Sequence, residues 1–106
     1  MPTVLIVDDS PDVRHIVRTF LEHEATFTVC GEASNGLEAI KKAQALKPDL
    51  VLLDLLMPGM NGIETAKVLR RLLLKTQIVL FSNYTDDLGK SLPSAVDIDA
   101  VIAKGV

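Results

Sequence analysis

The sequence contains a single cysteine, Cys30, and no long uninterrupted apolar run. One cysteine cannot form an internal disulfide, which fits a reducing compartment, and its ordinary interpretation is a small buried apolar residue. No stretch of about 18 apolar residues is present, and no charged segment followed by an apolar core opens the chain. We therefore expect neither a membrane span nor a secretion signal, and the sequence predicts a cytoplasmic protein.

The chain also lacks an excess of basic residues. The chain has 11 Lys and Arg against 14 Asp and Glu, a formal net charge of -3, and no cluster of basic side chains. Phosphate backbones are bound by clustered Lys and Arg, so we expect no nucleic-acid surface on this part of the protein. The remaining composition, 48% apolar and 24% charged, is that of one globular domain with a real core.

Apolar runs rich in β-branched residues alternate along the chain with segments of helical periodicity. The predicted strands are residues 3–9, 27–33, 49–54, 77–83 and 99–104, and the predicted helices begin at residues 11, 37 and 62. The segment 84–98 has no clear prediction because Gly89 and Pro93 interrupt any helix there. Alternation with short connections predicts an α/β fold with a doubly wound, five-stranded parallel sheet.

The first predicted helix begins with Ser10 as N-cap and Pro11 at the first helical position. Its apolar residues recur at i, i+3, i+4, i+7 and i+8, which is the pattern of one helix face. We expect that whole face to pack on the core. The residues concerned are Val13, Ile16, Val17, Phe20 and Leu21.

Four predicted strands end in polar residues, and these residues are Asp8 and Asp9, Asp54, Ser82, and Lys104. Ligands of a doubly wound sheet bind outside the carboxyl ends of the strands, where the strand order reverses. Each residue alone has an ordinary explanation as a cap, a turn residue or a surface charge. Their shared position at one edge indicates a functional site.

The residue types at that edge suggest a particular chemistry. Crowded carboxylates repel one another, and a hard divalent cation with oxygen ligands relieves that repulsion. Mg²⁺ takes one or two carboxylates, keeps several waters and also binds phosphate oxygens. An acidic pocket with a hydroxyl and a lysine nearby is therefore suited to a phosphoryl group, with one aspartate as the nucleophile.

The stretch DLLMPGMNG carries the most specific motif. An aspartate that ends an apolar run is costly to bury unless something there uses it. The motif D-x-x-M-P-x-x-[DN]-G is met at Asp54, Met57, Pro58, Asn61 and Gly62, and on these residues the chain resembles the receiver domains of two-component response regulators. The stretch VCGEASNGLEAI is similar to the NarL/FixJ-type subfamily, whose receivers usually precede a helix-turn-helix DNA-binding domain.

The resemblance implies a flavodoxin-like sheet with strand order 2-1-3-4-5 and a magnesium site, with Mn²⁺ as an alternative ion. Asp9, Asp54 and the backbone carbonyl of Leu56 would bind the ion directly, and Asp8 would act mainly through water. A sensor histidine kinase or a phosphotransfer protein would phosphorylate Asp54.

Ser82 and Lys104 would contact the phosphoryl oxygens, and their movement would shift the domain between two conformations. Receivers commonly carry Tyr or Phe as a switch residue in the fifth strand, where this sequence has Val101. Tyr84, two residues after Ser82, is the candidate replacement. Gly105 stands where many family members have proline, so the usual rigid turn is absent.

The family pattern also includes a fifth helix after the last strand, whereas the sequence ends at Val106. We therefore expect residues 1–106 to be a C-terminally incomplete receiver domain. An output domain would follow Val106, and a homodimer is compatible with the family.

Two enzyme classes fit less well. The Gly-Lys-Ser at 89–91 resembles the end of a P-loop, but Tyr84 occupies the place of its first glycine. Aspartyl phosphatases of the haloacid-dehalogenase type need a second aspartate where Leu56 stands. We expect no metabolic enzyme, only magnesium-dependent self-phosphorylation from a phosphodonor and autodephosphorylation. The alternative is a receiver-like interaction module that works without phosphorylation, although such modules usually lose the aspartates or the lysine.

Overall fold

A computed structural model describes residues 1–24, 26–82 and 100–103 of the chain. The elements are β1 (Thr3–Val7), α1 (Pro11–Glu24), β2 (Thr28–Ala33), α2 (Gly36–Leu46), β3 (Leu50–Asp54), α3 (Gly62–Leu72), β4 (Gln77–Ser82) and β5 (Ala100–Ala103). All paired strands run parallel, in the order β2-β1-β3-β4-β5. The prediction of an α/β fold with a parallel sheet is confirmed.

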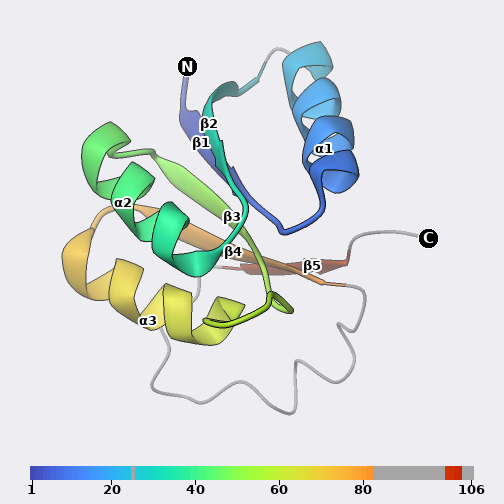
Figure 1. Cartoon of the computed structure of the whole chain (residues 1–106). Coiled ribbons are helices and arrows are strands. Elements are labelled where there is room, and N and C mark those ends of the chain that lie inside the picture. Colours follow the sequence, from blue (N-terminus) through green and yellow to red (C-terminus); the bar gives the residue numbers. More distant parts are fainter. Residues whose placement is uncertain (25, 83–99, 104–106) are drawn as a thin grey trace.

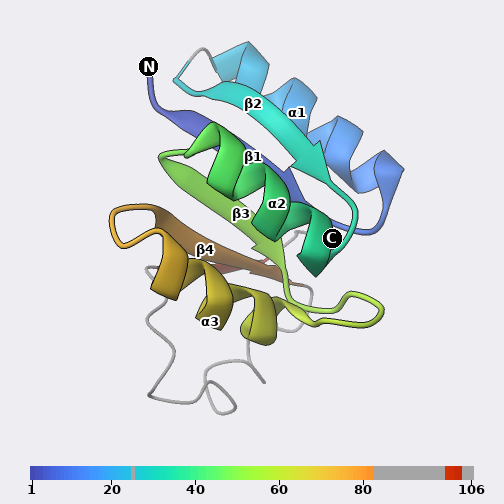
Figure 2. The same cartoon turned by 60° about the vertical axis from the view of Figure 1, so that its left-hand side comes forward.

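The helices cover both faces of the sheet. α1 lies on one face, and α2 and α3 lie side by side on the other (Figures 1 and 2). Because strand side chains alternate between faces, neighbouring residues of β1 enter different cores: Leu5 packs under α2 and α3, and Val4 packs on the α1 side. Burial on both faces explains why β1 and β3 are nearly continuous apolar runs.

The predicted core face of α1 is only partly correct. Val17 and Leu21 pack against the smaller of the two cores, but the side chains of Ile16 and Phe20 are 66% and 62% exposed. Residues spaced by four lie along one line of a helix. Val17 and Leu21 form the line that faces the sheet, and Ile16 and Phe20 form the neighbouring line. The contact of α1 with the sheet is therefore narrower than its apolar stripe.

Cys30 lies on β2, where it is half-buried rather than fully buried. Its thiol contacts the backbone carbonyl of Val4, with Sγ and oxygen 3.4 Å apart. Burial raises the pKa of the Cys30 thiol above its ordinary value, which keeps the sulfur protonated at neutral pH. None of the helices in the described ranges is both long and apolar enough to cross a membrane.

Candidate functional site

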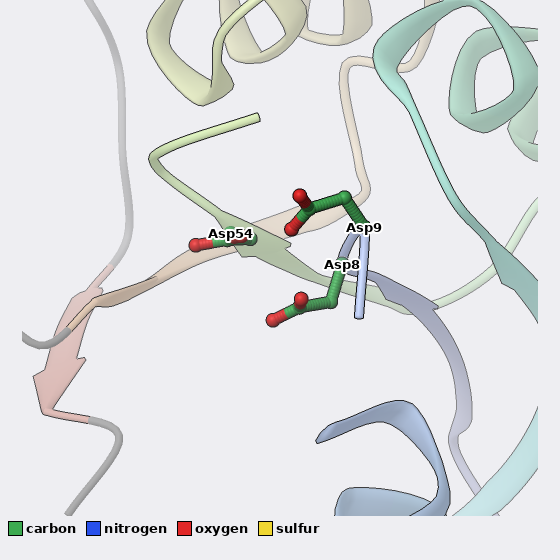
Figure 3. A group of neighbouring side chains, drawn as sticks. All are labelled: Asp8, Asp9 and Asp54. Atoms are coloured by element: carbon green, nitrogen blue, oxygen red, sulfur yellow. The ribbon is translucent and has the colours of Figure 1, made fainter. Parts of the chain in front are cut away.

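Three aspartates meet at the carboxyl ends of β1 and β3. Asp8 and Asp9 follow β1 directly, and Asp54 is the last residue of β3. The two strands are adjacent and in register, with Val7 opposite Leu53, so their ends coincide. One carboxylate oxygen from each aspartate lies within 4.8 Å of the other two, and the three side chains extend toward the same side (Figure 3). The sheet thus brings together residues from distant parts of the sequence.

The backbone orients the two buried carboxylates in the same way. Asp8 and Asp54 are 1% and 3% exposed, whereas Asp9 is exposed to solvent. Oδ1 of Asp8 accepts a hydrogen bond from the amide of Ser10 at 2.9 Å, and Oδ1 of Asp54 accepts one from the amide of Leu56 at 3.4 Å. In each case the acceptor carboxylate and the donor amide are two residues apart, which is the Asx turn that aspartate favours after a strand.

The loop from β3 to α3 is built around a close approach of the backbone. Asn61 caps α3, because its side chain accepts from the amide of Glu64 at 2.9 Å while the Glu64 carboxylate accepts from the amide of Asn61. The amide of Gly62 donates to the carbonyl of Leu55 at 2.8 Å. A Cβ on Gly62 would lie 2.4 Å from the carbonyl oxygen of Asp54, so α3 can begin here only with glycine.

The donor set fits a hard divalent cation. Three carboxylates provide oxygen ligands and excess negative charge, which is the chemistry that Mg²⁺ and Mn²⁺ prefer. Asp8, Asp9 and Asp54 are the residues that would hold the ion. The backbone of Leu56 lies beside this acidic group, because its amide donates to the Asp54 carboxylate at 3.4 Å.

Ser82 is the last residue of β4, and its backbone lies beside β3 at the same edge, since Asp54 pairs with Phe81. Val101 lies in β5, where its backbone pairs with Leu80. Tyr84, Lys104 and Gly105 lie outside the described residues, as does the P-loop-like sequence at 89–91. The positions of the predicted switch and phosphoryl-contact side chains therefore stay predictions.

A cleft of about 460 Å³ opens beside Asp9, between the start of α2 and the β3–α3 loop. Asp9 is one of the residues that line it, together with the apolar residues Leu37, Pro58 and Met60. Leu37 is 63% exposed. Asp9 is itself exposed, so the acidic group is open to solvent at this residue.

One neighbour of the aspartates was not predicted from the sequence. Arg14 on α1 donates from Nη1 to the backbone carbonyl of Asp8 at 2.6 Å and from Nε to the carboxylate of Glu32 at 3.0 Å. In the sequence, an arginine on the polar side of an amphipathic helix looks like an ordinary solvated charge. The distance of 18 residues between Arg14 and Glu32 left no local spacing that could have indicated the contact.

A sequence profile of the response regulator receiver domain matches residues 4–106. The nitrate/nitrite response regulator protein NarL of Escherichia coli K12 is 45% identical over 97 residues, covering 90% of this chain and 45% of that protein. The transcriptional regulatory protein LiaR of Bacillus subtilis is 41% identical over 87 residues, covering 82% of this chain and 41% of that protein. The chain thus spans less than half the length of these two relatives.

A solved structure of the response regulator TrrA of Thermotoga maritima, in complex with Mg²⁺ and BeF, has the same fold. It is 33% identical in sequence and aligns with a TM-score of 0.88 over 99% of this chain and 88% of that chain.

Proposed function

Because this chain belongs to the response regulator receiver domain family, we propose that it accepts a phosphoryl group on Asp54 from a histidine kinase or a phosphotransfer protein. The resemblance to the NarL/FixJ-type subfamily is confirmed by the similarity to NarL and LiaR. The five-stranded order 2-1-3-4-5 belongs to the same proposal, and the order of the described strands supports it.

The observation that carries the proposal is the convergence of three carboxylates at the ends of β1 and β3. Asp54 is held at the end of a buried strand, and its neighbours Leu53 and Met57 are in the core. A nucleophile fixed in this way loses little orientational freedom when it reacts. Asp54 also occupies the first position of the receiver motif, so we assign it the nucleophilic role in preference to Asp8 and Asp9.

In the proposed reaction, a carboxylate oxygen of Asp54 attacks the phosphorus of the donor phosphohistidine. The P–N bond breaks as the new P–O bond forms, and the imidazole nitrogen leaves with the electron pair and takes up a proton. Asp9, Asp54 and the backbone carbonyl of Leu56 would hold Mg²⁺ directly and Asp8 mainly through water, and the ion would supply positive charge beside the phosphoryl oxygens. Ser82 and Lys104 contact those oxygens in this proposal, and hydrolysis of the acyl phosphate regenerates Asp54.

Phosphorylation would act by shifting a conformational equilibrium that exists before it. Ser82 is the first residue of that switch, and Tyr84 or Val101 takes the place of the usual aromatic residue. We further propose that residues 1–106 form the receiver part of a longer transcriptional regulator, because NarL and LiaR are more than twice the length of their matching segments. The chemistry is limited to taking up and losing phosphate.

The test is the intact mass of the protein after incubation with acetyl phosphate, with and without Mg²⁺. We expect a gain of one phosphoryl group that requires Mg²⁺, because the acidic group cannot accept an anion without a cation. No gain in a folded sample, repeated on a version extended beyond Val106, would contradict the proposal. It would favour the alternative, a receiver-like interaction module that works without phosphorylation.

Magnesium is also expected to stabilise the fold without any phosphodonor. The ion relieves repulsion among three carboxylates that are crowded only in the folded state, so at a concentration about 100 times its Kd it adds about 2.7 kcal/mol to the free energy of unfolding. Thermal unfolding followed by circular dichroism measures this gain. Asp9→Asn should lose most of it, whereas Asp12→Asn, at an exposed aspartate of α1 outside the cluster, should keep it. An equal gain in both variants would exclude the cluster as the metal site.

A further inference from the structure

Arg14 connects the helix α1 to the backbone of the acidic site. Its guanidinium uses two different nitrogens: Nη1 donates to the carbonyl of Asp8, and Nε donates to Oε1 of Glu32 on β2. The side chain is only 17% exposed, although arginine is usually solvated. A planar guanidinium has its donors in fixed directions, so these two contacts together define where the Asp8 carbonyl lies.

The carbonyl that Arg14 holds belongs to the peptide group between Asp8 and Asp9. On its amino side, Asp8 is already fixed, because its amide donates to the carbonyl of Ala33 on β2 at 3.0 Å. The Arg14 contact fixes the carboxyl side. Rotation of this one peptide group would turn Asp9 relative to Asp8 and Asp54, and a metal site tolerates little such displacement.

Glu32 anchors Arg14 from the neighbouring strand. Its Oε1 accepts from Arg14 and its Oε2 accepts from Nε of Arg18 at 2.7 Å, one helical turn further along α1. Lys42 on α2 donates to the backbone carbonyl of Glu32, so this residue is held from both faces of the sheet. The anchor of Arg14 is therefore part of the rigid sheet.

We expect Arg14 to affect the acidic site through the direction of its hydrogen bond more than through its positive charge. Its ion pair with Glu32 compensates the positive charge at 3.0 Å, which reduces the field of Arg14 at the three aspartates. The hydrogen bond from Arg14 to the Asp8 carbonyl is not weakened in this way, because it depends on the direction of the donor as well as on its charge. The effect to expect is thus on the orientation of the Asp8–Asp9 peptide.

We propose that Arg14 is a positioning residue of the metal site: by clamping the Asp8 carbonyl against Glu32, it holds Asp9 in the orientation in which the three aspartates bind Mg²⁺. This inference rests on the proposed function of the site, and it adds a residue on α1 that does not itself touch the ion or the phosphoryl group.

Arg18 provides a matched control. It pairs with the same Glu32 carboxylate, and its other hydrogen bond goes to Glu22 on α1. Replacing either arginine by methionine removes one guanidinium from Glu32 while keeping an apolar stem of similar length. Only Arg14→Met also removes the contact with Asp8.

The experiment measures Mg²⁺ binding by isothermal titration calorimetry on the wild type, Arg14→Met, Arg14→Lys and Arg18→Met. We expect Arg14→Met to raise the Kd for Mg²⁺ about tenfold, and Arg18→Met to change it by less than about twofold. Arg14→Lys keeps the charge without the two-nitrogen geometry, so its Kd should lie near that of Arg14→Met. The amide resonance of Asp9 in ¹⁵N spectra should shift in the Arg14 variants and stay in place in Arg18→Met.

Equal Kd values for Arg14→Met and Arg18→Met would overturn the proposal, as would an Arg14→Lys variant that binds Mg²⁺ like the wild type. If Arg14→Met does not fold, the Kd of Arg14→Lys for Mg²⁺ tests the proposal in its place. Phosphoryl uptake separates this inference from the proposed function, because it should fall in Arg14→Met at low Mg²⁺ and recover at saturating Mg²⁺. A wild type that binds Mg²⁺ and takes up no phosphate would contradict the function and leave the Mg²⁺ comparison valid.

Discussion

Asp54→Asn is expected to take up no phosphoryl group from acetyl phosphate under conditions that phosphorylate the wild type fully. The amide of asparagine is a very poor nucleophile, so the rate should fall by about 10³-fold or more. The substitution preserves shape: the side-chain oxygen of asparagine can still accept the hydrogen bond from the Leu56 amide. It also removes one of three crowded charges, so without Mg²⁺ the variant should unfold at a slightly higher temperature than the wild type.

Intact mass measures this loss, and thermal unfolding shows that the variant is folded. Asp12→Asn is the matched control, because it removes an aspartate of α1 that lies outside the acidic cluster. This control should be phosphorylated like the wild type. Phosphate that still enters Asp54→Asn, located by peptide mapping to Asp8 or Asp9, would move the acceptor role to that residue.

Gly62→Ala is expected to destabilise the fold by about 3 kcal/mol, which lowers the midpoint of thermal unfolding by roughly 15 °C. The added Cβ would lie 2.4 Å from the carbonyl oxygen of Asp54 and 2.7 Å from the Cα of Leu55. Both are backbone atoms, so no side chain can move aside to make room. Either α3 shifts away from the sheet or the end of β3 moves, and the second change displaces Asp54. Mg²⁺ affinity should therefore fall together with stability.

Gly59→Ala is the control for the loss of a glycine in the same loop. Gly59 has φ of +77°, and no atom lies within 4 Å of the position that a Cβ would take there. Its substitution therefore costs only the strain of a left-handed residue, about 1 kcal/mol. Chemical denaturation of the two variants compares the free energies of unfolding. If Gly62→Ala lowers the free energy of unfolding no more than Gly59→Ala does, the start of α3 can move away from β3 at little cost, which would contradict this prediction.

The sequence was a good guide where one local pattern carried the answer. The alternation of apolar runs with helical periodicity predicted the parallel sheet, and the aspartates after two of those runs predicted an acidic site at its edge. This works because parallel strands joined by helices all present their carboxyl ends to the same side. The predicted start of a helix at residue 62 was equally local, because the cap of α3 joins Asn61 to Glu64, only three residues away.

The sequence was a poor guide to the burial of individual side chains, because burial depends on how much of a helix or strand its neighbours cover. Five apolar residues of α1 share a stripe, yet Ile16 and Phe20 stay exposed because α1 meets the sheet along a narrower line. Cys30 was expected to be buried and is half-buried on β2. Periodicity identifies a face of a helix and says nothing about the width of its partner.

By itself, the sequence determined the class of the fold, the aspartates and the motif around Asp54, because each depends on residues close together along the chain. The tertiary structure decided which distant residues come into contact. These contacts are the three carboxylate oxygens within 4.8 Å, the glycine of α3 against the end of β3, and the arginine of α1 on the backbone between two aspartates. Such contacts join residues that are distant in sequence, and only the packing of helices and strands fixes their distance.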